Sequence, residues 1–181
     1  MQDGKIVAAC EQERYSGKKH SREFPIYAIN DCLKIAKINI SEITEIAFCD
    51  RVYFSIIEMY LKPLLDNDKS KAKYIFRDIE KIKRFLKVED LIREKLNYKG
   101  KIQFYSHHLC HLAGAYFSSG FKNSLAFSFD GIGDNVSSHF GVCKNGNINV
   151  IHSGSKFPDS LGLFYSAITD YLGCRHHCDE G

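Results

Sequence analysis

Two histidines at helical spacing and an aspartate after an apolar run are the residues whose types and spacing could do chemistry. His107 and His111 are four positions apart, so a helix would stack their rings on one face. Asp130 follows the apolar run Leu125–Phe129, and an aspartate at a strand end is a natural oxygen ligand. The pattern therefore predicts a metal site made of His107, His111 and Asp130.

Taken alone, the histidine spacing fits surface or capping histidines equally well. The HExxH motif of metalloproteases is excluded, because His108 occupies the position of the glutamate that would act as the base. Cys110 should point away from the face shared by His107 and His111 and join the core.

The segment Asp130-Gly131-Ile132-Gly133-Asp134 is the second candidate. It matches neither the P-loop nor the Rossmann glycine pattern, and it lacks the periodic oxygen ligands of an EF-hand. One interpretation is a turn with an aspartate cap. The other is a loop whose backbone N–H groups face phosphates while an aspartate holds a metal.

A rival metal site lies near the end of the chain, in the sequence Cys174-Arg-His-His-Cys178. Thiolates and imidazoles this close suit zinc, but a closed tetrahedral site needs a full ligand set. No second cysteine pair at standard spacing occurs elsewhere in the sequence.

The elements that would position these residues alternate between strands and helices. Lys5–Glu11 and Glu45–Cys49 are predicted strands, and Pro25–Lys37 is a predicted helix with one apolar stripe. Ser41 could cap a short turn between the helix and the second strand. Strand, helix and strand in this order predict an α/β layered fold.

The stretch from about Asp50 to Gly100 has a different character, and we expect a helical insertion there. Val52–Leu65 is apolar and aromatic, and the charged segment Lys71–Leu96 predicts one amphipathic helix or two joined near Val88. Its basic excess is typical of a solvated helix face. No aromatic-interleaved pattern accompanies it, so we expect no nucleic-acid binding.

The polar stretch Glu11–Arg22 is expected to be a solvated loop. The functional alternative is a rim that supplies basic side chains to an anionic ligand. Those side chains would come from Arg14, Lys18, Lys19 or His20.

The second half of the chain should be a short strand, the histidine helix, a sheet and a final helix. Ile102–Tyr105 and the buried strand Leu125–Phe129 precede a loop over Asp130–Asn135. Strands Ser138–Cys143 and Ile148–Ile151 flank the dipeptide Asn145-Gly146, which is a strong hairpin signal. Asp159 or Ser160 should cap a helix over Leu161–Leu172 that Gly173 closes.

Composition places the chain among ordinary globular proteins. Its 181 residues can bury one substantial core, and the net charge of +3 implies no general attraction to nucleic acid or membranes. No signal peptide or apolar run of spanning length is visible. The seven scattered cysteines then predict reduced thiols in a cytoplasmic protein.

Four ordered stretches together resemble one family, the O-carbamoyltransferases of nodulation and antibiotic biosynthesis. They are VAACEQERYSGKKHSREFP, SHHLCHLAGAYFSSGF, FSFDGIGD and FPDSLGLFYSAITDYLG. The resemblance implies an actin-like ATPase domain, a ribonuclease H-like mixed sheet flanked by helices. It is similar to the domain that modifies tRNA threonine in the threonylcarbamoyl pathway.

Carried over by position, the resemblance implies that His107, His111 and Asp130 bind a metal, iron(II) first and zinc as the alternative. It implies that His108 forms hydrogen bonds beside the metal and does not bind it. It also implies that Gly131, Gly133 and Asp134 lie beside nucleotide phosphates. Lys19 and His20 match the family's Lys-His pair, and the resemblance implies that they line the acceptor or nucleotide side as the catalytic residues.

The implied reaction uses ATP and carbamoyl phosphate to make a carbamoyl-adenylate. The carbamoyl group then moves to a hydroxyl of a sugar or natural-product acceptor. The partners implied are this small molecule and a downstream domain of the same protein, with a homodimer left open. The alternative is a non-catalytic module of the same fold that binds metal and nucleotide.

The chain also departs from the family pattern. It starts after the family's first strand, and a further aspartate ligand, the second half of the ATPase domain and the YrdC-like domain would lie beyond Gly181. We therefore expect residues 1–181 to be part of a carbamoyltransferase amino-terminal domain and to yield no carbamoylated product alone. Sequencing the gene past Gly181 would separate the enzyme from the non-catalytic module.

Overall fold

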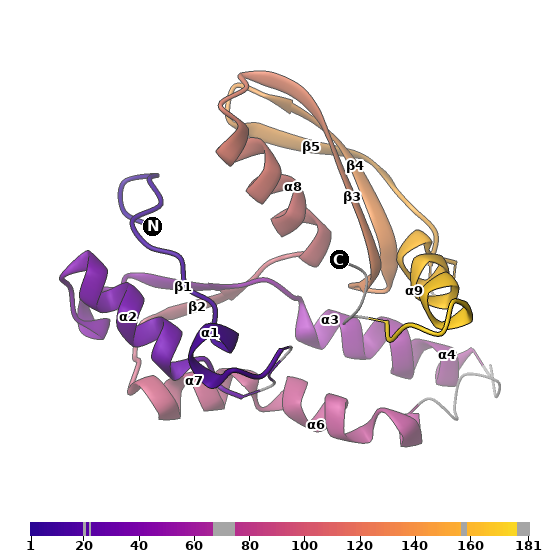
Figure 1. Cartoon of the computed structure of the whole chain (residues 1–181), viewed down its shortest axis with the longest axis horizontal. Coiled ribbons are helices and arrows are strands. Elements are labelled where there is room, and N and C mark those ends of the chain that lie inside the picture. The colour runs from indigo at the N-terminus through magenta and orange to yellow at the C-terminus, as the bar shows by residue number, and fades with distance from the viewer. Residues whose placement is uncertain (20, 22, 67–74, 157–158, 177–181) are drawn as a thin grey trace. The chain divides into compact units, whose positions relative to one another are not determined.

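The computed structural model describes residues 1–19, 21, 23–66, 75–156 and 159–176 as an α/β chain (Figure 1). The chain divides into two compact units, which we describe separately. Unit 1 comprises Met1–Ile46 and Val88–Ile102, and unit 2 comprises Ala47–Lys87 and Gln103–Gly181. His107, His111 and Asp130 all lie in unit 2. Among the described residues, no helix has the length and apolar character needed to cross a membrane.

Unit 1 contains the helices α1 (Glu13–Ser16), α2 (Ile26–Ala36) and α7 (Val88–Leu96). The predicted helix after Pro25 is confirmed, and it ends where Lys37 adopts a left-handed conformation with φ 57°. The predicted cap at Ser41 is wrong. A 3₁₀ turn over Ile40–Glu42 begins at Asn39, whose backbone N–H donates to the Glu42 carboxylate at 2.7 Å.

The predicted strand over Lys5–Glu11 is wrong. Only an isolated bridge joins Gln2 to Lys5, across the turn at Asp3-Gly4. A strand needs a hydrogen-bonding neighbour, and no described residue pairs with the segment that follows Lys5, where Ile6 is 67% exposed. The predicted loop over Glu11–Arg22 is interrupted by α1.

The two predicted strands on either side of the helical stretch are confirmed and pair with each other. They are β1 (Glu45–Phe48) and β2 (Lys101–Phe104). In unit 2, the Tyr105 N–H donates to the Phe48 carbonyl at 2.8 Å, which extends the pairing toward the histidine helix.

The stretch between these strands is mostly helical in the part that the structure describes, and its status as an insertion stays a prediction. In unit 2 it forms α3 (Val52–Ile56), a π-helical turn (Ile57–Leu61), α4 (Lys62–Leu65) and α6 (Ile79–Leu86). Pro63 has no N–H to bond the Met59 carbonyl, which favours the wider π turn at this place. The charged segment was predicted to be one helix or two joined near Val88, and the structure agrees with the second alternative, because α6 ends at Leu86 and α7 begins at Val88.

The main sheet of unit 2 is an antiparallel meander of β3 (Asn123–Gly133), β4 (Val136–Lys144) and β5 (Asn147–Ser153). The hairpin at Asn145-Gly146 is confirmed, with both residues at positive φ. The prediction of a loop over Asp130–Asn135 is wrong in part. β3 continues through Asp130 to Gly133 with a register shift after Phe129, and only Asp134 and Asn135 form the turn.

The helix α8 (His107–Ser119) packs on one face of this sheet (Figure 1). Leu112 and Tyr116 of the helix meet Ala126 of β3 and Cys143 of β4 in the core of the unit. The prediction that Leu125–Phe129 is a buried strand is wrong in part: Leu125, Phe127 and Phe129 are 52–62% exposed, because alternate β3 residues face away from α8.

The final helix, α9 (Leu161–Tyr171), lies against β3 in unit 2 (Figure 1). Its predicted cap is confirmed at Ser160, whose hydroxyl oxygen accepts from the Leu163 N–H at 3.2 Å. Gly173 follows the helix at φ 80°, as expected for a residue that closes it.

Candidate metal centre

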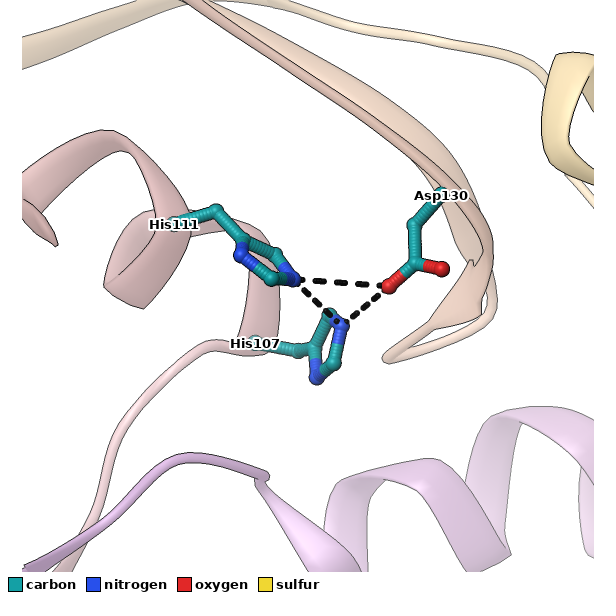
Figure 2. Close-up of side chains that lie close together, drawn as sticks. All are labelled: His107, His111 and Asp130. Carbon is teal, nitrogen blue, oxygen red and sulfur yellow. Dashed lines mark hydrogen bonds and ion pairs between the residues drawn. The ribbon is translucent and has the colours of Figure 1, made fainter. Parts of the chain in front are cut away.

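Three side chains from two elements converge on one point. The His107 ring nitrogen Nε2 lies 2.6 Å from Asp130 Oδ2 and 3.1 Å from His111 Nε2 (Figure 2). His111 Nε2 lies 3.4 Å from the same Asp130 oxygen. Within the described ranges of the chain, these residues are the group of histidine, cysteine and acidic side chains that could hold a metal ion.

The separations of these atoms fit a shared ion. Ligand atoms about 2.1 Å from one ion, at angles between octahedral and tetrahedral, lie about 3.0–3.4 Å apart. The two distances that involve His111 fall in this range. The third, 2.6 Å, is the length of a charge-assisted hydrogen bond between His107 and Asp130. The donor set therefore suits a divalent metal after a small separation of that pair.

The helical period places the two histidines at the rim of the core. His108, Leu112 and Tyr116 repeat every fourth residue and form the buried stripe of α8. His107 and His111 stand one position before this stripe, so they form the neighbouring stripe. The side chain of His107 is 25% exposed and that of His111 is 53% exposed, which leaves the site open on the His111 side.

His108 forms hydrogen bonds, as predicted, and takes no part in the cluster. Its Nδ1 lies 2.9 Å from the Ser128 hydroxyl and its Nε2 lies 2.9 Å from the Val136 carbonyl. Burial lowers its pKa, which favours a neutral ring that donates one hydrogen bond and accepts the other. Cys110 is half-buried, and burial raises the pKa of its thiol.

Strand alternation places Asp130 opposite the histidines. Ala126 and Ser128 face α8, and Asp130 is the next residue in the same period. Two contacts then fix it: Asp130 Oδ1 accepts from the Gly131 N–H at 2.6 Å, and its carbonyl accepts from the Ser160 hydroxyl at 2.6 Å. Ser160, the cap of α9, thus also holds the backbone of β3 at Asp130.

Glycines allow the close approach of these elements. A Cβ atom at Gly133 would overlap the His107 ring, and one at Gly162 would overlap the backbone of Asp130 and Gly131. At Gly131 itself the nearest atom would be a Leu163 methyl at 3.9 Å, an ordinary contact. Gly133 and Gly162 are therefore required for packing around the candidate site.

The charges of the His107–Asp130 pair reinforce each other. The hydrogen bond to Asp130 raises the pKa of His107, although burial opposes this. The same hydrogen bond lowers the pKa of Asp130 to about 2, with help from the Gly131 N–H. Without a metal, this hydrogen bond thus favours the charged forms of both groups.

Asp134 is 1% exposed at its side chain and is surrounded by protein donors. Its Oδ2 accepts from the His107 N–H and from Arg51 Nε, both at 3.0 Å. Its Oδ1 accepts from the Arg51 N–H at 3.1 Å and lies 3.2 Å from the Ser55 hydroxyl. Burial alone would favour the neutral acid, but the donors from Arg51 and His107 hold the pKa of Asp134 below its usual value.

Asp134 therefore supplies the cap that Ser106 does not. Ser106 stands before the first residue of α8, yet its side chain makes no capping hydrogen bond. The Asp134 carboxylate instead meets the first N–H of the helix, where a negative charge is favourable. This contact fixes the backbone of His107.

Sequence reasoning missed Asp50, Arg51 and Ser55. Burial raises the pKa of Asp50, and its hydrogen bond with Asp134 raises it further. The Ser55 hydroxyl lies 3.1 Å from Asp50 Oδ1 and can donate to either carboxylate. The available signal was the dipeptide Asp50-Arg51 directly after a predicted strand, the same kind of signal that identified Asp130.

In the part of the chain that the structure describes, none of the remaining predicted residues lies at this centre. Lys19 is exposed in unit 1, and His20 lies outside the described residues. Of the rival cysteine-histidine cluster, Cys174 is exposed and His176 Nδ1 lies 2.7 Å from Asp170, while His177 and Cys178 are outside the described residues. The catalytic roles and the zinc alternative stay predictions.

The fold and the site together define a class of protein. It is an α/β chain that carries a cluster of two histidines and one aspartate between a helix and a strand. Residues 1–181 match the family described as the carbamoyltransferase N-terminus. The chain belongs to this family, as its four ordered sequence stretches predicted.

Among its relatives is nodulation protein NolNO of Sinorhizobium fredii, 34% identical over 96% of this chain and 24% of the relative. An uncharacterized protein of Synechocystis is 30% identical over 99% of this chain and 30% of its own length. One of Methanocaldococcus jannaschii is 30% identical over 97% of this chain and 28% of its own length. The chain thus spans less than a third of the length of each of these relatives.

Proposed function

We propose that His107, His111 and Asp130 bind a divalent metal that serves carbamoyl transfer to a hydroxyl group. The observation that carries the proposal is the convergence of two imidazole nitrogens and one carboxylate oxygen on a point, in a chain of the carbamoyltransferase family. Imidazole and carboxylate ligands suit both iron(II) and zinc. We favour iron(II), which the family resemblance implies first, and keep zinc as the alternative.

Each residue has a distinct part in this proposal. Asp130 supplies the negative charge, and His111 borders the open side. His107 is held in place by the hydrogen bond from its backbone N–H to Asp134. Three protein ligands leave coordination positions for substrate, as in catalytic metal sites. A bound cation would supply a Lewis acid that offsets phosphate charge and polarises a carbonyl or hydroxyl oxygen.

The reaction we propose passes through a carbamoyl-adenylate made from ATP and carbamoyl phosphate. Water cleaves carbamoyl phosphate to carbamate and phosphate, and a carbamate oxygen then attacks the α-phosphorus of ATP, from which pyrophosphate leaves. The oxygen of the acceptor hydroxyl attacks the carbamoyl carbon, the bond from that carbon to the adenylate phosphate oxygen breaks, and AMP leaves with the electron pair. The hydroxyl proton passes to a base. We propose a sugar or natural-product hydroxyl as the acceptor, by analogy with the family.

The nucleotide assignments rest on the family resemblance. In this proposal Gly131, Gly133 and Asp134 border the phosphates within an actin-like fold, and Lys19 and His20 line the acceptor or nucleotide side. Asp134 would act by holding the loop in place, because its carboxylate oxygens are engaged by Arg51, Ser55 and His107.

Metal titration of the full chain tests the site. The metal-free chain should bind one equivalent of iron(II), under anaerobic conditions, or of zinc. His111→Ala should weaken binding by at least about 100-fold, since one of three ligands is lost. His152→Ala, a histidine outside the cluster, and the double variant Cys174→Ala/Cys178→Ala are the controls.

The outcomes separate the two metal sites. Binding that survives His107→Ala and His111→Ala but disappears in the double cysteine variant would overturn the proposal in favour of the terminal cluster. Transfer itself is measured on the full product of the gene, with labelled carbamoyl phosphate, ATP and a panel of hydroxyl acceptors. Metal binding without any ATP-dependent labelling would favour the non-catalytic module.

A further inference from the structure

Unit 2 contains a second site-like feature, a cavity of about 130 Å³ at the turn between β3 and β4. Ile132 and Asn135 form one wall, the π-helical turn around Tyr60 forms another, and Arg77, Lys81 and Lys156 complete the lining. All of these residues belong to unit 2. The cavity does not include His107, His111 or Asp130.

The helical walls of the cavity are held in place by buried contacts. Tyr60 is 4% exposed, and its hydroxyl donates to Asp78 Oδ2 at 3.0 Å. This bond joins the π turn to the segment that carries Arg77 and Lys81. π turns inside helices occur frequently at functional sites. The wall is therefore a fixed structure with an unusual backbone.

The charges of the lining leave a positive excess. Arg77, Lys81 and Lys156 are opposed by Glu58 and Asp78. Asp78 is already engaged by Arg77 at 2.8 Å and by Tyr60, and Glu58 lies 3.4 Å from Lys62, which is outside the lining. In the described part of the chain, neither Lys81 nor Lys156 forms an ion pair. Two ammonium groups are thus available to one small cavity.

The strand side of the cavity supplies neutral donors. Asp134 and Asn135 both have left-handed backbone conformations, at φ 50° and 69°, and form the tight turn that places Asn135 in the cavity lining. An isolated bridge between Val136 and Lys156 keeps Lys156 beside this turn. A side-chain amide and two ammonium groups are donors that suit an oxyanion.

We propose that this cavity binds a phosphoryl group, either free phosphate or the phosphate end of a larger molecule. The volume is below the roughly 300–1,000 Å³ of sites that enclose whole ligands, so a tetrahedral oxyanion suits it better than a nucleoside. Several cations around one cavity favour a dianion over a single carboxylate. The inference needs neither the metal nor carbamoyl transfer.

Inorganic phosphate is the probe, titrated into the full chain by calorimetry at low ionic strength. Lys81→Gln and Lys156→Gln should each weaken phosphate binding about tenfold, the size expected for one charge-assisted hydrogen bond. Lys83→Gln is the matched control, because Lys83 lies on the same helix but pairs with Glu80 and does not line the cavity. Glu58→Gln should tighten binding about threefold, since it removes an opposing charge.

Parallel titrations with carbamoyl phosphate and ATP distinguish the sources of the phosphoryl group. Dependence on Lys81 and Lys156 with all three ligands supports the site, and the tightest ligand identifies the natural source. No phosphate binding, or equal losses in Lys83→Gln, would overturn it. His111→Ala should leave phosphate binding unchanged, so failure of the metal proposal and failure of this one are distinguishable.

Discussion

The two ends of the segment Asp130–Asp134 carry the same side chain and use it in opposite ways. Asp130 is 37% exposed, and its Oδ2 faces two imidazole nitrogens at the open edge of α8. Asp134 is 1% exposed and is engaged by Arg51, Ser55 and the His107 N–H. A carboxylate with one oxygen directed at other ligands can bind a metal, whereas one saturated by protein donors can only support structure.

The difference follows from where the strand leaves the sheet. Asp130 keeps the alternation of β3 and so faces α8 at its rim. Asp134 lies beyond the register shift, in the turn, where its side chain is directed into unit 2. The proposed metal ligand and the residue that supports it thus come from one short segment, and variants at its two ends can test the comparison.

Asp134→Ala should have the largest effect. It leaves Arg51 without its carboxylate and the first N–H of α8 without its acceptor, so we expect the free energy of unfolding to fall by about 3 kcal/mol. Urea unfolding followed by circular dichroism measures it, with the exposed Asp159→Ala as the control. A loss below about 0.5 kcal/mol would show that Asp134 is not a structural residue.

Asp130→Asn should have the reverse profile. Metal affinity should fall about 100-fold, equal to about 2.7 kcal/mol, because an anionic ligand becomes neutral. The free energy of unfolding should change by less than about 1 kcal/mol, since the pair with His107 is partly exposed. Anaerobic iron(II) titration and urea unfolding of the same samples test both statements. Equal stability losses in Asp130→Asn and Asp134→Ala would remove the distinction between the two ends.

Gly133→Ala and Gly131→Ala sharpen the comparison within the segment. A methyl group at Gly133 overlaps the His107 ring, so we expect a loss of about 2 kcal/mol in unfolding free energy and weaker metal binding. At Gly131 the nearest atom is 3.9 Å away, and the loss should stay below about 1 kcal/mol. Thermal unfolding of the two variants side by side gives the answer, and similar losses would contradict it.

The smallest expected effect is the pH dependence of the His107–Asp130 pair in the metal-free chain. The contribution of Asp130 is present above its unfolded pKa of about 3.9 and is lost as pH falls through its folded value of about 2. That of His107 is present below its unfolded pKa of about 6.5 and is lost as pH rises through its raised folded pKa. The difference in unfolding free energy between the wild type and His107→Ala should therefore peak between about pH 4 and 6.5, at about 1 kcal/mol or less. A flat difference curve would exclude an ion pair.

Sequence patterns predicted the parts of this site that depend on short-range geometry. The spacing of His107 and His111 set their common face, Asn145-Gly146 set the hairpin, and Ser160 set the start of α9. Each depends on the conformations of a few neighbouring residues, which local residue types largely decide. The motif order also identified the family.

The same reasoning failed where pairing or burial over long distances decides the structure. Lys5–Glu11 has the composition of a strand, but only Lys5 forms a bridge, to Gln2, and no described residue pairs with the segment after it. The exposed face of β3, its register shift and the continuation of the strand through Asp130 depend on which neighbours cover each side. Residue types along the chain do not specify those neighbours.

The sequence alone thus determined the ligand types, the helical spacing of the two histidines and the family of the chain. Only the tertiary structure showed that Asp134 is buried among protein donors while Asp130 faces the two histidines. Asp134 meets Arg51 across 83 residues and His107 across 27. A buried carboxylate must be satisfied by donors, and its donors are known only when distant segments have come together.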